Sequence, residues 1–368
     1  MTIAQPLPRR LSLQCTQLLL VPTLLALAAC GGGGGGDSTA APTPQPTSKP
    51  TLAPTGIPTA VPTGLPTGTP TTAPGANEAF APINTASRAE VVARYQDAFL
   101  PLRATAFSWT GSTGTCNPGD TPLSYKYAEV KLLNYLRAMG GLPGNVTLSL
   151  LLSTKAQQAA LMMDANGKLS HAPDASWKCY SADGAEAAGR ANLGLSSGTL
   201  NAGIGGMGMY ITDGGVASLG HRRWLLYSRL GEVGVGDTPR ANALYVIGGK
   251  AAPAPTLANG VPWPPAGYVP QDSSLALPTL PWSFSYPGAD FSAATVALTD
   301  DTNTAIALTS VGQLDNGYGD NTLSWTISPG ATGWNRYPAD TRLNVLISNV
   351  KIAGVAKNFS YGVTFIKP

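Results

Sequence analysis

The chain has 368 residues, of which 12% are charged, whereas about 25% are charged in an average soluble domain. Its 43 Gly and 32 Pro residues indicate that part of the chain is linker, while a hydrophobic content of 43% is enough for a sizeable core. The net charge of +3 provides no basic footprint for phosphates and argues against nucleic acid as a partner. The chain contains only two histidines, His171 and His221, which excludes a three-histidine metal site.

Residues 1–29 have the layout of a secretory signal peptide. Arg9 and Arg10 give a basic start, and the apolar run of residues 18–29 is too short for a permanent membrane span. The run ends Leu-Ala-Ala before Cys30, which resembles the bacterial lipoprotein box. The resemblance implies cleavage before Cys30 and lipidation of its sulfur. The alternative is an ordinary signal in which Cys30 is incidental.

The residue after Cys30 is Gly31 rather than Asp, which by analogy with bacterial lipoproteins favours the outer membrane over the inner one. We therefore predict an outer-membrane lipoprotein of the bacterial cell envelope, facing the periplasm or the cell surface. The protein would be attached to the membrane through its N-terminal lipid anchor.

Residues 30–77 are predicted to be a tether. Six glycines occupy positions 31–36, and from Pro46 to Pro74 a proline recurs at every fourth position. Such a tract favours extended polyproline II and has nothing to bury. At about 3.1 Å per residue it could lift a domain on the order of 100 Å from the membrane. A low-complexity tail without a spacing role would have the same sequence.

The cysteines agree with export. Cys15 leaves with the signal and Cys30 takes lipid, so Cys116 and Cys179 remain. Because exported proteins meet an oxidising environment, these two are predicted to form a disulfide.

Residues 78–240 are predicted to form a mostly helical domain. A capping box at Ser87 to Glu90 opens a first helix, which Pro101 should stop. Further helices are expected over residues 123–139, over residues 148–166 and from about Asp213 through His221. The Gly-rich residues 190–212 between the last two are predicted to contain short strands, with Gly205 to Gly208 as a close-packed strand or turn.

Residues 241–275 are predicted to be a Pro-rich connector and residues 276–368 an Ig-like β-sandwich. Alternating runs predict strands over residues 295–299, 305–309, 323–327, 343–347 and 361–366. No catalytic constellation is visible there, so binding or structural support is the expected role of this domain.

The two histidines carry the chemistry that the sequence offers. Two imidazoles brought together can hold a divalent metal such as Zn or Mg with carboxylate or water ligands, or one of them can act as a general base. A lone histidine on an apolar helix face is, however, more often a satisfied structural residue.

A series of motifs resembles the CAP superfamily, which includes the cysteine-rich secretory proteins, antigen 5 and plant pathogenesis-related proteins. The motifs are Asn134-Tyr135-x-Arg137 with Gly-Gly-Leu142 after it, Leu169-Ser170-His171, Gly220-His221-Arg222-x-Trp224 and Gly234-Val235-Gly236. The resemblance covers about residues 87–240. It implies an α-β-α sandwich with a central cavity built from two histidines and two acidic residues. The predicted fold class is therefore α+β: a three-layer α-β-α CAP sandwich followed by the β-sandwich.

His171 and His221 match the two cavity histidines of the family, but the acidic half departs from the pattern. Ala191 stands where the family usually has glutamate in Gly-Glu-Asn. Asp213 is the candidate for the second acid, and Glu186 and Asp183 are alternatives nearby. The predicted cavity residues are His171, His221, Asp213, Glu186 and Asn192, with the two histidines as the candidate metal ligands. Replacing a carboxylate by alanine removes a metal ligand and weakens the case for metal binding.

These features predict a membrane-tethered, non-enzymatic CAP module that binds a partner, such as a protein or cell-wall component, or a small apolar or lipid ligand. The first alternative is a hydrolase or protease with His221 as base and His171 or Asp213 as its partner. The second is a purely structural surface protein with a filled cavity. Because CAP proteins have diverse activities, the resemblance constrains the fold better than the function.

Overall fold

The computed structural model describes residues 78–198, 202–329 and 340–368. The predicted signal peptide, lipidation site at Cys30 and tether lie outside the described residues. Within the described part, no helix is long and apolar enough to cross a membrane.

The N-terminal domain is built on a four-stranded sheet in the order β1-β3-β4-β2. These strands are β1 (Thr147–Leu148), β3 (Glu232–Asp237), β4 (Ala241–Tyr245) and β2 (Ala191–Leu195). The short strand β1 is parallel to β3, whereas the other neighbours are antiparallel.

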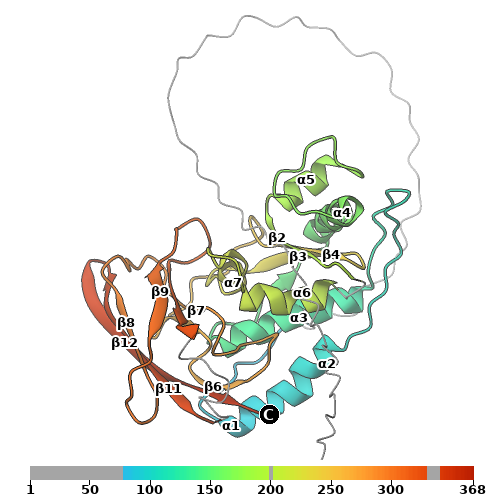
Figure 1. The fold of residues 1–368 in the computed structure, drawn as a ribbon. Coiled ribbons are helices and arrows are strands. Elements are labelled where there is room, and N and C mark those ends of the chain that lie inside the picture. The colour runs from blue at the N-terminus through green and yellow to red at the C-terminus, as the bar shows by residue number, and fades with distance from the viewer. Residues whose placement is uncertain (1–77, 199–201, 330–339) are drawn as a thin grey trace, which may run out of the picture.

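Two helical layers enclose this sheet, as Figure 1 shows. On one face lie α4 (Leu150–Asn166) and α5 (Ala182–Ala188). On the other face lie α3 (Leu123–Met139), α6 (Ala202–Thr212) and α7 (Gly220–Leu225). The alternation of side chains along a strand serves both layers: Leu193 and Tyr245 belong to the cluster beneath α4 and α5, and Leu244 belongs to the cluster on the opposite face. The predicted three-layer α-β-α sandwich is confirmed.

The Gly-Val-Gly motif of β3 allows α4 to approach the sheet closely. A Cβ on Gly234 would lie 2.4 Å from the backbone carbon of Leu152, and one on Gly236 would lie 2.2 Å from that of Ala156. Any larger residue at either position would therefore push the helix away from the sheet.

Several predicted helix boundaries are confirmed and one stop is wrong. Helix α3 spans the predicted residues, and α4 ends at the predicted Asn166, followed by Gly167, whose φ is 61°. The Ser87 hydroxyl caps α1 (Arg88–Arg94) by accepting from the Glu90 amide. The chain then continues helically through the π-helix η1 (Tyr95–Phe99) and α2 (Leu100–Arg103). Pro101 does not stop it: it is the second residue of α2 and directly follows the π-helical turn η1, where the local change of hydrogen-bonding pattern accommodates a residue without an N–H.

The prediction for the Gly-rich stretch is half wrong. Strand β2 is present, but the region of Gly205 to Gly208 belongs to helix α6 rather than to a strand or turn. Tertiary packing explains the helix, because glycine lets it sit tightly against neighbours: a Cβ on Gly208 would lie 2.9 Å from the Cβ of Ser274. The fourth predicted helix, α7, begins at Gly220 instead of near Asp213. A loop precedes it in which Asp213 and Leu219 both have positive φ.

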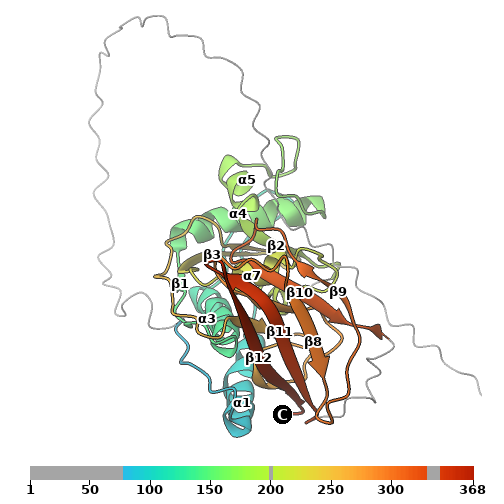
Figure 2. The ribbon, with the colours of Figure 1, turned by 90° about the vertical axis from the view of Figure 1, so that its left-hand side faces the viewer.

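The C-terminal domain consists of two four-stranded sheets, in the orders β5-β7-β10-β9 and β6-β12-β11-β8 (Figure 2). The first sheet contains β5 (Val261–Trp263), β7 (Trp282–Ser285), β10 (Thr322–Ile327) and β9 (Leu308–Gln313). The second contains β6 (Gly267–Pro270), β12 (Val355–Ile366), β11 (Arg342–Ile352) and β8 (Thr295–Thr299). Aromatic rings from the two sheets meet between them: Trp282 lies 6.0 Å from Phe365, and Phe284 lies 4.9 Å from Phe359.

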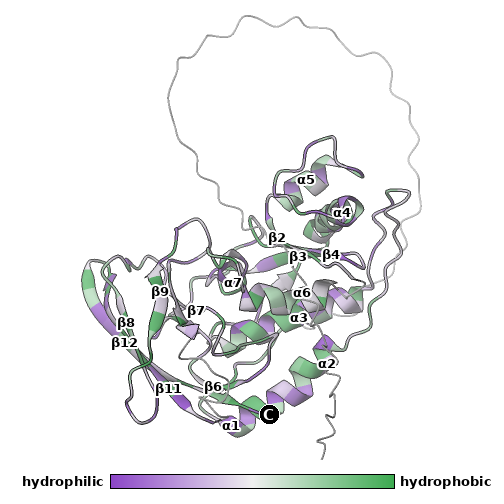
Figure 3. Cartoon of the chain, in the orientation of Figure 1, coloured by the Kyte–Doolittle hydropathy of each residue, from purple (hydrophilic) through white to green (hydrophobic). Residues whose placement is uncertain are grey.

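This arrangement confirms the predicted β-sandwich. The alternation of buried and exposed residues that predicted a strand around Leu343, Val345 and Ile347 extends along β11, and Figure 3 shows alternating hydrophobic and hydrophilic bands on β11 and β12. The strand predicted over residues 305–309 begins later, at Leu308.

The structure shifts the predicted domain boundaries. Strand β4 lies inside the N-terminal sheet, so that domain continues beyond residue 240. Strands β5 and β6, within the predicted connector of residues 241–275, belong to the two C-terminal sheets. The abundance of proline concealed both, because proline is tolerated in edge strands such as β5 and β6.

The predicted disulfide is confirmed. Cys116 and Cys179, 63 positions apart in the sequence, are bonded, which ties the loop before α3 to the loop before α5.

Candidate functional site

The centre of the candidate site is a buried histidine–aspartate pair. His221 follows the first residue of α7, and Asp213 follows α6, and each residue is only 2% exposed. His221 Nδ1 lies 2.8 Å from Asp213 Oδ1, and Asp213 Oδ2 accepts a hydrogen bond from the Arg222 amide at 3.1 Å. The carboxylate thereby holds the ring with Nδ1–H as donor, so Nε2 carries the lone pair when the imidazole is neutral.

The remaining contacts of His221 fix the ring in place. The Tyr210 ring stacks on it with centroids 5.1 Å apart and an interplanar angle of 19°. Asn192 Nδ2 donates to the His221 carbonyl at 3.1 Å. His221 Nε2 is buried and has no hydrogen-bond partner among the described residues. The structure thus brings together three predicted cavity residues: His221, Asp213 and Asn192.

The other two predicted cavity residues make different contacts. His171 is half-buried in the loop between α4 and α5, where its Nδ1 lies 2.7 Å from the Ala188 carbonyl oxygen. Glu186 pairs with Lys155 and accepts a hydrogen bond from Tyr245 Oη at 3.0 Å. The hydrogen bond from Lys155 holds the pKa of the Glu186 carboxyl below its usual value. Glu186 therefore belongs to an ion-pair cluster on the α4–α5 layer, together with Asp183, which also pairs with Lys155.

The residues present do not fit a metal site. Across residues 78–198, 202–329 and 340–368, no group of three or more His, Cys, Asp or Glu side chains could hold a metal ion. Around His221 the donors are one carboxylate and one imidazole whose Nδ1 is already engaged by that carboxylate. A protein zinc site ordinarily needs at least three such ligands. Ala191, where the family resemblance implies a glutamate, packs in the apolar cluster beneath α4 and α5 and offers no ligand.

A second buried polar group, the carboxyl pair of Glu129 and Asp237, was not predicted from the sequence. Glu129 on α3 and Asp237 at the end of β3 are both fully buried. Asn242 Nδ2 donates to Glu129 Oε1 at 3.0 Å and to Asp237 Oδ1 at 2.9 Å. The second oxygens, Glu129 Oε2 and Asp237 Oδ2, have no hydrogen-bond partner among the described residues. Two carboxyl groups in such a setting cannot both be ionised, so the pair is expected to hold a proton.

Burial is the main cause of the altered acidity of this pair. It raises the pKa of Asp237 to about 6. It also raises the pKa of Glu129 well above its usual value, and the neighbouring Asp237 charge adds to that rise. The pair is linked to the histidine, because Asn242 Oδ1 accepts from Tyr210 Oη at 2.7 Å and Tyr210 stacks on His221.

Replacing Gly203 with alanine is expected to lower the free energy of unfolding by about 2 kcal/mol, as overpacking in a tight core does. Gly203 lies in the first turn of α6, where a Cβ would come within 2.2 Å of Asp237 Oδ1 and 2.5 Å of Glu129 Oε2. Urea unfolding of the full chain measures the change. Gly205→Ala in the same helix is the matched control, because its Cβ would meet nothing within 4 Å. Equal stability of the two variants would contradict this account of the carboxyl pair.

A four-stranded sheet between two helical layers, with a buried His–Asp pair beside it, defines an α-β-α sandwich of the CAP type. The sequence comparison agrees: residues 130–248 match the model of the cysteine-rich secretory protein family, CAP, and this part of the chain is a CAP domain. The match begins within α3 and ends just after β4, and it includes both histidines. No curated protein matches the chain.

Proposed function

We propose that the protein is a membrane-tethered, extracytoplasmic CAP module that binds a ligand without transforming it. The observation that carries the proposal is that the groove on the surface lies apart from the buried His221–Asp213 pair. His221 and Asp213 are sealed within the packed interior. A groove of about 690 Å³ lies instead where the CAP domain meets the β-sandwich. A groove of this size suits a small ligand or a segment of a partner, whereas a sealed imidazole has no access to substrate.

The tether is part of the proposal. The signal-like residues 1–29, Cys30 and the Gly- and Pro-rich residues that follow support attachment to the outer membrane through lipid, with the folded domains held away from it. Cys30→Ser should release the chain from the membrane fraction if the anchor is a lipid on this residue. Retention of the variant in the membrane fraction would argue for another mode of attachment.

Binding is tested with two probes, because lipids and cell-wall material are both candidate ligands. The full chain is titrated with vesicles of phosphatidylethanolamine and phosphatidylglycerol and, separately, with purified peptidoglycan. Saturable binding of either probe would support the proposal. The probe that does not bind serves as the control for non-specific association. Absence of binding to both would count against these two ligand classes.

A hydrolase is the second candidate, and one observation favours it. In a catalytic histidine, a carboxylate orients Nδ1–H so that Nε2 can accept a proton, which is the arrangement of Asp213 and His221. Against it, no hydroxyl or thiol of the described residues hydrogen-bonds to His221 Nε2.

We expect wild type and His221→Ala to give the same rates with p-nitrophenyl butyrate and with casein, both at the level of the uncatalysed reaction. His171→Ala is the matched control, since it removes the imidazole that does not contact Asp213. Turnover that is present in wild type and in His171→Ala but absent in a folded His221→Ala would overturn the binding proposal in favour of the hydrolase. Far-UV circular dichroism establishes that each variant is folded.

A further inference from the structure

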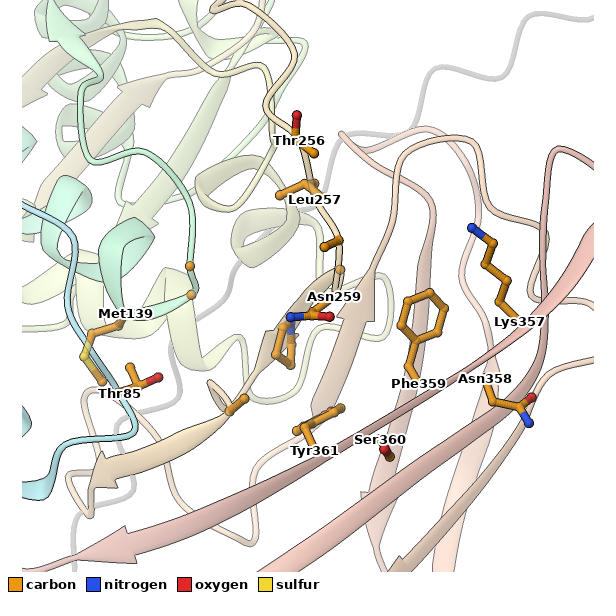
Figure 4. A pocket seen from close by; sticks show the side chains of 16 residues that line it. Thr85, Met139, Thr256, Leu257, Asn259, Lys357, Asn358, Phe359, Ser360 and Tyr361 are labelled. Carbon is orange, nitrogen blue, oxygen red and sulfur yellow. The ribbon is translucent and has the colours of Figure 1, made fainter.

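This groove between the CAP domain and the β-sandwich is lined by four parts of the chain that are distant in sequence. Residues 357–361 of β12 form one wall, residues 256–260 form the opposite wall, and Thr85 with the end of α3 at Met139 closes one end (Figure 4). Lys357, Phe359 and Tyr361 share one face of β12, while Asn358 and Ser360 point to the other face.

The wall formed by β12 is an unpaired strand edge. On one side β12 pairs with β11 along nearly its whole length, from Val355 to Thr364. On the other side it pairs with β6 only from Val363 to Ile366. Within the part of the chain that the structure describes, no strand therefore lies beside the remainder of that second edge, and this remainder faces the groove.

The direction of the backbone groups along this edge follows from the contacts at its paired end. The Ile366 carbonyl oxygen accepts from the Gln271 amide, on the side of β6, whereas the Phe365 carbonyl oxygen accepts from the Asp340 amide, on the side of β11. Successive residues of a strand direct their backbone groups to opposite edges. Counting back from Ile366, Asn358 and Ser360 direct their N–H and C=O groups toward the open edge.

Two aromatic rings beside this edge are held in place but not covered. Phe359 packs against Phe284, at 4.9 Å between centroids, and against Tyr286, at 5.8 Å. Phe359 and Tyr361 are nevertheless only half-buried. Tyr361 Oη is itself buried and has no hydrogen-bond partner among the described residues. A ligand that suits the groove must thus supply both backbone-like hydrogen-bonding groups and apolar surface.

We propose that the groove binds an extended peptide, which adds to the sheet as a strand beside β12. Main-chain hydrogen bonds would form with Asn358 and Ser360, and apolar side chains at alternate positions would cover Phe359 and Tyr361. Among the 16 residues that line the groove, Lys357 is the only charged one. The peptide that fits therefore carries a carboxylate, from Asp, Glu or its own C-terminus, within reach of Lys357.

The prolines at every fourth position of residues 46–74 make that tract a poor occupant, because a proline cannot donate to a β-ladder. This inference rests on the proposed function, since it assigns a partner class to the binding module.

The test is selection from a phage-displayed library of random ten-residue peptides on the immobilised full chain, followed by titration of the selected peptides in synthetic form. Wild type is expected to enrich acidic peptides with alternating apolar residues. Ser360→Pro removes an outward N–H and should weaken their binding at least tenfold, whereas Ser360→Ala keeps the N–H and should bind as wild type does. Lys357→Glu changes an exposed side chain outside the core and should weaken binding of acidic peptides about three- to tenfold.

Thermal unfolding of each variant establishes that it is folded. If Ser360→Pro does not fold, the proposal is tested with Lys357→Glu and with amide hydrogen exchange, which should slow at Asn358 and Ser360 when peptide is bound. Selection of no peptide, or selected peptides that bind Lys357→Glu and Ser360→Pro as tightly as wild type, would overturn the proposal. So would a concentration-dependent dimer that Ser360→Pro abolishes, since the occupant would then be a second copy of the chain. If no peptide bound but vesicles or peptidoglycan bound saturably, the proposed binding function would still hold and only the peptide partner would be excluded.

Discussion

Replacing Arg222 with methionine is expected to lower the free energy of unfolding by about 4 kcal/mol, the range seen when one partner of a buried polar network is removed. The Arg222 guanidinium is almost completely buried and donates to three backbone carbonyl oxygens, those of Ile211 at 2.7 Å, Thr212 at 2.6 Å and Pro281 at 2.7 Å. Methionine preserves most of the volume but donates nothing, so these oxygens would be left buried without a partner.

The position of Arg222 makes the effect larger than a local one. Ile211 and Thr212 end α6 in the CAP domain, while Pro281 lies directly before β7 of the β-sandwich, and Arg222 also donates to Ser283 Oγ within that strand at 3.2 Å. One side chain therefore joins the two domains beside the His221–Asp213 pair. Burial lowers the pKa of Arg222 to about 10, which still leaves the guanidinium charged at neutral pH.

Urea unfolding followed by circular dichroism and by tryptophan fluorescence measures this loss. Arg229→Met is the matched control, because Arg229 is exposed and its loss should change stability by less than about 0.5 kcal/mol. A loss below about 1 kcal/mol for Arg222→Met would mean that water or a shifted neighbour satisfies the three carbonyl groups.

The sequence was most informative where a local pattern determines the structure. The hydrophobic periodicity of residues 123–139 predicted α3 correctly, because the helix buries its apolar face. The contact between Asp213 and His221 could also be predicted, since the CAP resemblance pointed to the histidine and to an acid eight positions earlier. Helix α6 was not, because its glycines have low helix propensity and only the close packing of neighbouring elements explains their use.

Features created by distant segments left no local trace. Glu129 appears as one polar residue on an amphipathic helix and Asp237 as one acid after a strand, and only the folded sheet brings both to Asn242. The open edge of β12 likewise depends on how far β6 extends beside it, which proline and glycine near residues 262–270 did not reveal. In both cases the missing information is the pairing of elements rather than their type.

The protein is expected to lose stability as the pH rises from about 5 to 7, with the Glu129–Asp237 pair as a main cause. Burial raises the pKa of both carboxyl groups above their values in the unfolded chain. Over that range the folded state therefore binds more protons than the unfolded state, and the linkage relation makes the free energy of unfolding fall as the pH rises. Below the unfolded pKa both states are protonated and the full stability is present.

The size of the loss follows from the number of protons involved. One proton held by the folded state alone corresponds to about 1.4 kcal/mol per pH unit, or about 3 kcal/mol between pH 5 and 7. Asp320, whose pKa burial also raises, contributes in the same direction. The contribution of the pair is therefore the difference between the slopes of wild type and Glu129→Gln. In this variant the Gln amide can donate to Asp237 but does not titrate.

Urea unfolding of wild type and variants at pH 5, 6 and 7 measures the slope. Glu129→Gln should flatten it by about 1 kcal/mol per pH unit. Glu186→Gln is the matched control: its carboxyl has a lowered pKa and titrates below this range, so the slope should equal that of wild type. If Glu129→Gln retained the wild-type slope, Glu129 would not hold the proton, and Asp237 or Asp320, whose pKa values burial also raises, would account for the slope. A flattened slope would establish a shared proton in the interior, joined through Asn242 and Tyr210 to His221.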